Sequence, residues 1–193
     1  MSTKRIEALT DGVFAIAMTL LVLNFKVPVL PLDSRLLLRG LIEMIPKFVN
    51  FAISFFILAS LWTGHHRQDH LIKKANNEIL WLNSAELLFV IIIPFSTSLY
   101  GEYGQLQIAA LFLEINILLI SFMSLWQWFY ATRNQRLVDA DLDPHAIAVG
   151  TTINLVVPAV TFVTIAVSFF SPENSTIPFI FIPLVMSRLR RRA

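Results

Sequence analysis

Carboxylates inside otherwise apolar stretches are the residues of this chain that could do chemistry. Asp11 lies near the start of one apolar segment, and Glu86 and Glu114 lie within two longer ones. Acids in such positions are costly in a membrane, and they mark ion pathways or proton relays when they face a bundle interior. Glu86 and Glu114 could therefore relay protons in a transporter, but no third carboxylate at matching depth completes a relay. Hydrogen bonding between helices is the simpler interpretation.

Other polar residues share helical faces with these acids, and each such stripe predicts hydrogen bonds between helices. A later apolar segment carries a comparable stripe and a proline that should kink it. The stripes consist of Asn76, Asn83 and Glu86; of Gln107, Glu114 and Ser121; and of Asn154, Pro158 and Thr161.

Asp11 needs a partner from outside its own helix if it is charged. Arg5 precedes it by six positions, about 240° around a helix, so the two side chains cannot pair across one turn. His65 and His66 end the second apolar segment at the same level, and one of them could hydrogen-bond Asp11. A favourable interaction of Asp11 with the positive end of the helix dipole is the alternative.

A metal site is a weaker interpretation of the histidine-containing stretch. His66 and His70 share a helical face and Asp69 lies between them, but the stretch lacks a further obvious ligand. A solvated basic loop explains it better, and no structural metal is expected. The chain has no cysteine, so disulfides, thiol catalysts and thiolate metal sites are excluded.

The elements that hold these residues are predicted to be membrane helices. Of the 193 residues, 56% are apolar and only 15% are charged, and the mean hydropathy is +0.69. A soluble domain carries about a quarter charged residues. Irregular backbone is excluded from lipid, so we expect an all-α membrane protein, a single six-helix bundle over residues 1–193. The six candidate spans are about 6–27, 46–65, 77–99, 105–130, 146–170 and 175–189.

The last span is the shortest of the six. Its uninterrupted apolar part runs from Thr176 to Met186 and contains Pro178 and Pro183. Such a segment could lie at the interface or re-enter the membrane. A full span across a locally thinned bilayer, with the following arginines reaching the interface, is the favoured interpretation.

Basic residues predict the orientation. If all six segments span, eleven of the fifteen lysines and arginines lie on the same side as both termini. The positive-inside rule then places both termini in the cytoplasm. The other four basic residues, Lys26, Arg35, Arg39 and Lys47, all fall in the first loop. No basic run is long enough to suggest nucleic-acid binding.

Signatures of soluble enzymes are missing. The chain has no Gly-rich phosphate loop, no His-Glu-x-x-His and no Gly-x-Ser-x-Gly, so neither an enzyme nor a cofactor is expected. It also lacks Thr-Val-Gly-Tyr-Gly, the carbonyl filter of ordinary potassium channels.

The first apolar segment carries a recognisable motif, Arg5-Ile6-Glu7-Ala8-Leu9-Thr10-Asp11 followed by Gly12-Val13-Phe14-Ala15-Ile16-Ala17. It resembles the Arg-x-x-x-Phe-Ser-Asp and Gly-Val-Phe-Ala-Ile-Ala of the prokaryotic relatives of the lysosomal potassium channel called transmembrane protein 175. Leu9-Thr10 replaces Phe-Ser, which keeps the hydroxyl and loses the aromatic ring. Further matches, in the expected order, are Trp62-x-x-His65-His66-Arg67, Trp81-Leu82-Asn83 and Ile93-Pro94-Phe95.

The resemblance implies a homotetrameric cation channel of six-helix subunits in a prokaryotic cell membrane. The first helix of each subunit would line a central pore, through which potassium passes with a modest preference over sodium. The implied constriction consists of Ile16, Leu20 and Leu23, with the Thr19 hydroxyl nearby. The implied network of the motif consists of Arg5, Thr10, Asp11, His65, His66 and Asn83.

An apolar stripe on a membrane helix is by itself ordinary packing, so the pore interpretation depends on the resemblance. Three apolar rings spread over about 10 Å of helix would form a throat narrow enough to gate by dewetting. A proton-coupled secondary transporter that uses Glu86 or Glu114 is the main alternative, although no inverted repeat is evident. A non-conducting membrane scaffold is a further alternative.

Overall fold

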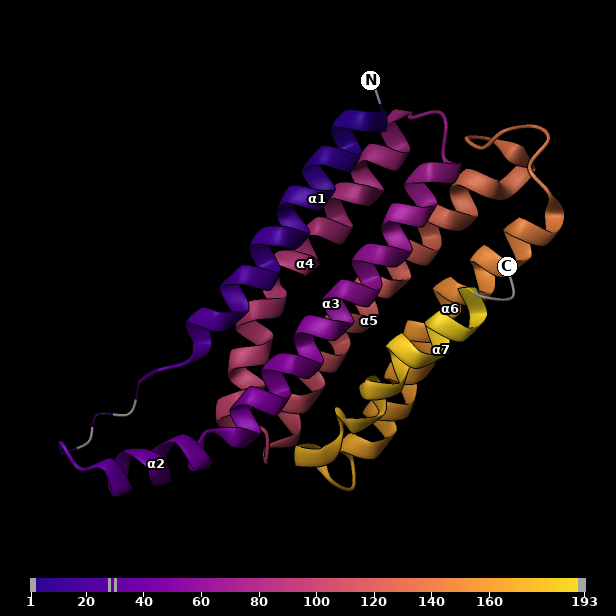
Figure 1. The fold of residues 1–193 in the computed structure, drawn as a ribbon. Coiled ribbons are helices and arrows are strands. Elements are labelled where there is room, and N and C mark those ends of the chain that lie inside the picture. The colour runs from indigo at the N-terminus through magenta and orange to yellow at the C-terminus, as the bar shows by residue number, and fades with distance from the viewer. Residues whose placement is uncertain (1–2, 28, 30, 191–193) are drawn as a thin grey trace.

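The computed structural model describes residues 3–27, 29 and 31–190, and the regular secondary structure of this part of the chain is helical apart from one isolated bridge between Ile72 and Val138. Pro28, Arg191 and Arg192, which the sequence assigned to a turn and to the basic C-terminal tail, lie outside the described residues. Long helices run side by side in Figure 1. In chain order the elements are α1 (Thr3–Leu20), η1 (Leu21–Asn24), α2 (Ser34–Glu43), α3 (Ile45–Leu71), α4 (Asn77–Tyr103), α5 (Gln107–Thr132), η2 (Arg133–Gln135), α6 (Pro144–Ser168), η3 (Pro172–Asn174), η4 (Ile177–Ile180) and α7 (Phe181–Arg190).

Five helical stretches of the described chain are long and apolar enough to cross a membrane, which confirms the predicted all-α membrane protein. The segment predicted as a sixth span is divided into η4 and the ten-residue α7. A helix of that length rises about 15 Å, roughly half of the hydrocarbon thickness. A count of six spans therefore stays a prediction. The five stretches are Thr3–Asn24, Ile45–Leu71, Asn77–Tyr103, Gln107–Gln135 and Pro144–Ser168.

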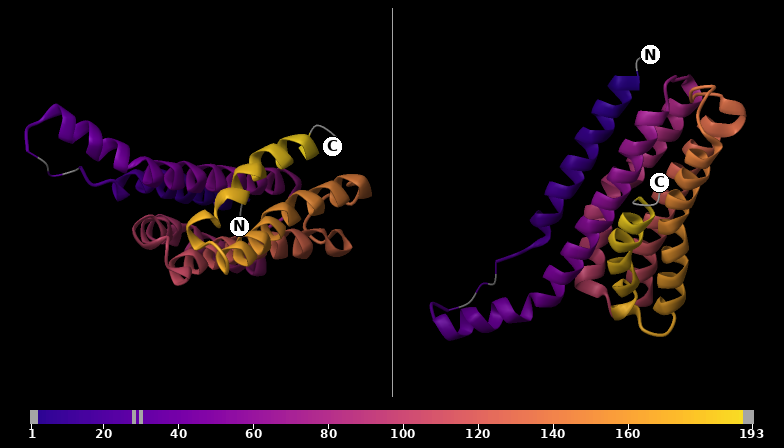
Figure 2. Two further views of the ribbon diagram at one scale, coloured as in Figure 1. Left: turned by 90° about the horizontal axis from the view of Figure 1, so that it is seen from below. Right: turned by 45° about the vertical axis from the view of Figure 1, so that its right-hand side comes forward.

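The first loop contains a helix that the sequence prediction missed. The Asp33 side chain accepts hydrogen bonds from the backbone N–H groups of Arg35 at 2.7 Å and Leu36 at 3.3 Å, which caps the N-terminus of α2. No residue of α2 is buried in the single chain. Figure 1 and Figure 2 show that α2 projects beyond the body of the bundle, at the end opposite the N-terminus.

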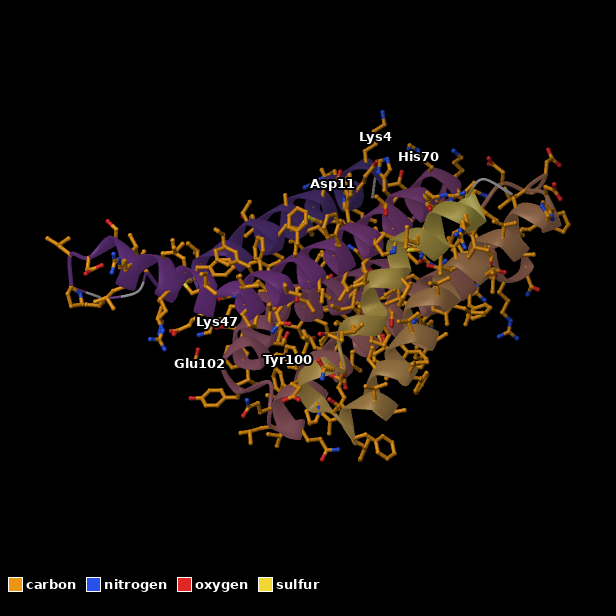
Figure 3. The ribbon with its side chains drawn as sticks, turned by 60° about the horizontal axis from the view of Figure 1, so that its bottom comes forward. Lys4, Asp11, Lys47, His70, Tyr100 and Glu102 are labelled. Atoms are coloured by element: carbon orange, nitrogen blue, oxygen red, sulfur yellow. The ribbon has the colours of Figure 1, made fainter. Side chains whose placement is uncertain are left out.

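The second span is longer than predicted. We expected it over 46–65, but α3 continues to Leu71, so the stretch that contains His66, Asp69 and His70 is helical. The interpretation of this stretch as a solvated loop is therefore wrong. Its polar side chains remain compatible with a helix because the last turns lie at the end of the bundle, the end at which Figure 3 shows both His70 and Lys4.

The core is centred on α5, which packs against α4 on one side and α6 on the other. Helices in lipid gain little from hydrophobic association, so close packing of side chains and hydrogen bonds between helices hold such a bundle together. The largest fully buried side chains include Phe14, Leu21, Ile57, Leu58, Ile93, Tyr100, Leu113, Ile117, Ile120 and Trp128.

Two of the three predicted polar stripes form hydrogen bonds between helices. Gln68 on α3 donates to Asn154 on α6 at 2.7 Å, and Asn76, just before α4, donates to Tyr130 on α5 at 2.7 Å. Two members of the stripes behave differently. The hydroxyls of Ser121 and Thr161 bond to backbone carbonyls of their own helices instead.

Candidate functional site

The first part of the site joins α1 to α4. The Thr10 hydroxyl donates to Asn83 Oδ1 at 3.3 Å and accepts from Asn83 Nδ2 at 3.1 Å. Both residues are almost completely buried. Because a buried polar group that loses its partner is costly, this pair fixes the rotation of α1 against α4. The structure thus brings together two of the residues that the motif network predicted.

Asp11 has a partner that the sequence prediction did not name. The indole Nε1 of Trp62 on α3 donates to Asp11 Oδ1 at 2.8 Å. The expectation that His65 or His66 would hydrogen-bond Asp11 is therefore wrong. The cause is the level along the helix: Trp62 and His66 share a face of α3 and their rings stack with centroids 5.8 Å apart, but Trp62 lies one turn earlier, at the level of Asp11, whereas His66 lies near Glu7.

A buried group of polar side chains surrounds His65. Its Nδ1 lies 3.3 Å from Glu86 Oε2, and its Nε2 lies 3.5 Å from Asp69 Oδ2. Glu86 also accepts a hydrogen bond from the amide of Gln127 on α5. His65, Glu86 and Gln127 are nearly inaccessible to solvent. This buried group connects α3, α4 and α5 about one turn along α4 from Asn83.

Other predicted network residues lie nearer the surface. His66 Nδ1 is 3.7 Å from Glu7 Oε1, and His66 Nε2 is 3.1 Å from His70 Nε2. Arg5 is exposed in the single chain, with no side-chain partner among the described residues. A metal-binding group of three or more His, Cys, Asp or Glu residues is not found in the described part of the chain. Figure 3 shows Lys4, Asp11 and His70 at the same end of the bundle.

Glu114 lies far from this group. It is completely buried on α5, close to the hydroxyls of Thr164, Ser168 and Ser175 near the opposite end of the bundle. Counted along the helices from their ends, Glu86 and Glu114 are on the order of 15 Å apart in depth. The two acids therefore do not form a contiguous proton relay.

The second part of the site is one exposed face of α1 and η1. In the single chain Ile16, Leu20 and Leu23 have 60%, 39% and 72% of their surface exposed. The opposite face, with Phe14 and Leu21, is completely buried against the bundle. The side chains of the stripe thus point away from their own subunit.

The first helix changes its geometry within this stripe. We expected one continuous helix over 6–27, but the α-helix begins at Thr3 and ends at Leu20, and a 3-10 helix continues to Asn24. Side chains three residues apart eclipse each other in a 3-10 helix, so this change brings Leu23 nearer to the angular position of Leu20 than a continued α-helix would. The Asn24 amide donates to the carbonyl of Pro94 at 3.0 Å and ties this end of the segment to α4. Thr19 is exposed, and its hydroxyl bonds to the carbonyl of Ile16 at 2.8 Å.

Comparisons with known proteins place this arrangement in a family. The profile of the family described as endosomal/lysosomal potassium channel TMEM175 matches residues 5–94. A potassium channel of Chamaesiphon minutus is 35% identical over 178 residues, which cover 88% of this chain and 85% of that relative. The chain belongs to the TMEM175 family. A potassium channel of Streptomyces collinus is 30% identical over 148 residues, or 74% of this chain and 70% of the relative.

The fold agrees with TMEM175 membership. The crystal structure of a lysosomal potassium-selective channel TMEM175 homolog from Chamaesiphon minutus superposes with a TM-score of 0.81 and 30% identity, and the match covers 97% of both chains. The relatives carry channel names, which confirms the expectation that the chain is not an enzyme. The matched range includes the positions of the predicted constriction and network, whose roles stay predictions.

Several residues of this TMEM175 network escaped the sequence prediction. Trp62 was noted for its place in the motif but not as the partner of Asp11, and Gln127 and Asp69 were not connected to Glu86 and His65. The signal for Gln127 is an amide in a strongly apolar helix, the same signal that identified Asn83. Nothing in the sequence specifies which helix faces which, so the pairing itself was not predictable.

Proposed function

We propose that the chain forms a homotetrameric, potassium-permeable channel in which the exposed face of α1 and η1 lines a central pore. The observation that carries this proposal is the outward-facing stripe of Ile16, Leu20 and Leu23, on a helix whose other face is fixed by hydrogen bonds to α3 and α4. Four identical helices around a closed rotational axis would bring each residue of the stripe into a ring. Membership of a family with named potassium channels supports this assembly.

The pore would be narrowest at the three apolar rings. The 3-10 segment brings Leu23 close to the angular position of Leu20, so in the tetramer their rings would form a continuous apolar sleeve below which Ile16 forms a third ring. An apolar throat of this kind gates by dewetting and selects by diameter and hydration, which gives only a modest preference for K+ over Na+. The exposed Thr19 hydroxyl supplies a polar contact at this level. Permeant K+ is the only non-protein component that this mechanism requires.

The network at the other end of α1 has a supporting role. Thr10, Asp11, Trp62 and Asn83 hold α1 against the bundle, so the rotation of the pore-lining face is set by buried hydrogen bonds. Arg5 and His66 lie at the periphery of the same end. We expect the membrane boundary there, because charged side chains are more stable at the boundary than in the hydrocarbon. We place this end and both termini in the cytoplasm, because most basic residues lie there.

Flux measurements on purified protein in liposomes test the proposal. We expect K+ flux that exceeds Na+ flux modestly, does not depend on a proton gradient, and persists in Glu86→Gln and Glu114→Gln variants. A proton-coupled secondary transporter, the main alternative, predicts the opposite result. Its flux would be saturable and pH-coupled, and either glutamine variant would abolish it. Absence of K+ flux from well-folded protein would contradict the channel.

A further inference from the structure

A cavity between α3, α5 and α6 takes no part in the proposed pore. Its volume is about 180 Å³, and it lies toward the end of the bundle that carries the Thr10–Asn83 pair, where α3 finishes and α6 begins. In Figure 1, α6 lies on the side of the molecule away from α1, and α3 lies between them. Among the residues that line the cavity are Arg67, Gln68, Leu71, Trp128, Val149 and Ile153.

Arg67 makes the cavity electrostatically unusual. It is the only charged residue among the described residues that line the cavity, and its Nη1 is buried without a hydrogen-bond partner. Arg67 is half-buried as a whole, but a guanidinium nitrogen that is buried without an acceptor is costly, and an anion in the cavity would offset that cost. The geometry of five donors on a planar group favours a phosphate or a carboxylate.

Gln68 supplies a second unsatisfied group in the same cavity. It is 3% exposed, and its Nε2 donates to Ser124 Oγ at 3.0 Å and to Asn154 Oδ1 at 2.7 Å, whereas its Oε1 has no partner. The cavity thus offers a cationic donor and a neutral acceptor. A phosphodiester whose headgroup carries a hydroxyl matches this pair.

The remaining wall of the cavity is apolar. Leu71, Val149 and Ile153 line it, and the Trp128 ring lies so close to Gly150 that a Cβ there would be 2.4 Å from Trp128 Cζ2. The indole N–H already donates to Thr151 at 2.9 Å, so the ring needs no polar partner from within the cavity. Such a wall suits a hydrocarbon chain.

We propose that this cavity binds an anionic phospholipid, with the phosphate against Arg67 and an acyl chain along the Trp128–Ile153 wall. Basic pockets between membrane helices near the cytoplasmic boundary hold the headgroups of anionic lipids. Arg67 lies four residues before the end of α3 and is therefore close to that boundary in the proposed orientation. The lipid would stabilise the junction of α3 and α6 without contact with the pore-lining stripe.

Native mass spectrometry of delipidated full-length protein tests the site with dioleoyl phosphatidylglycerol and, for comparison, dioleoyl phosphatidylcholine. We expect phosphatidylglycerol to bind about tenfold more tightly, and Arg67→Gln to remove that preference, since a charge-assisted contact of this size changes affinity by about that factor. Arg67→Lys should keep most of the preference. Val149→Trp, which fills the apolar wall, should weaken phosphatidylglycerol binding while Arg67 is intact.

Lys74→Gln is the matched control, because it removes an exposed positive charge beyond the same end of α3. It should bind phosphatidylglycerol like the unmodified protein. Preserved preference in Arg67→Gln, or equal loss in Lys74→Gln, would overturn the assignment. Displacement of phosphatidylglycerol by millimolar inorganic phosphate alone would identify a free-anion site and would also overturn it.

Discussion

Replacing Ile16 with alanine should raise K+ flux in liposomes and lower the preference for K+ over Na+. The substitution removes most of an apolar side chain from every subunit, which widens the ring and makes it easier to hydrate. A reduction of about 1.4 kcal/mol in the barrier to permeation corresponds to a flux about ten times larger. Because Ile16 is 60% exposed in the single chain, its truncation leaves no cavity in the core of the subunit.

A matched control separates this effect from a general perturbation of the membrane surface. Leu155 is 45% exposed and belongs to α6, the helix that Figure 1 shows on the side of the molecule away from α1. Leu155→Ala should leave both the flux and the ion preference unchanged. Equal fluxes for Ile16→Ala and the unmodified channel, measured at equal protein incorporation, would contradict the placement of this ring.

The largest effect on stability is expected at His65. A His65→Leu substitution removes the imidazole that faces Glu86 at 3.3 Å and leaves a buried carboxylate with only the Gln127 amide as partner. Loss of one member of a buried charged pair costs about 3–5 kcal/mol. We expect a large decrease in the thermal midpoint of the protein in detergent. His70 is exposed and lies more than one turn beyond His65, so His70→Ala should change the thermal midpoint little.

The double variant His65→Leu with Glu86→Gln sharpens this test. Glutamine carries no charge, and an amide pair with Gln127 retains one hydrogen bond, so much of the lost stability should return. The two substitutions should therefore be strongly non-additive in a double-mutant cycle. Additive losses would show that His65 and Glu86 do not interact as a pair.

Composition and periodicity were sufficient to predict the membrane helices. The predicted limits of α4, α5 and α6 are within about four residues of the observed ones, because apolar runs of such length have few alternatives. The end of α3 was missed because His66, Asp69 and His70 are polar, and the sequence does not tell whether a helix continues beyond the hydrocarbon. The missed α2 had a signal in Asp33, whose side chain caps it.

The site was predictable only in part, and the reason is the same throughout. The sequence identifies which positions of one helix share a face, so the stripe of Ile16, Leu20 and Leu23 could be named. It does not specify the relative rotation of separate helices, which decides that Asp11 meets Trp62 and that Glu86 meets His65. The 3-10 turn after Leu20 was also unforeseen, because these leucines and valines are compatible with either helix type.

Modification of a single cysteine introduced at Leu23 tests the central claim most directly. The natural chain has no cysteine, so a cationic methanethiosulfonate reagent reacts only at the introduced position. If Leu23 lines the pore, modification of Leu23→Cys should block most of the K+ flux, because it places positive charge and bulk in the narrowest part. The same treatment of Leu155→Cys should have no effect. Unchanged flux after complete modification of Leu23→Cys would contradict the assignment of α1 and η1 as the pore lining.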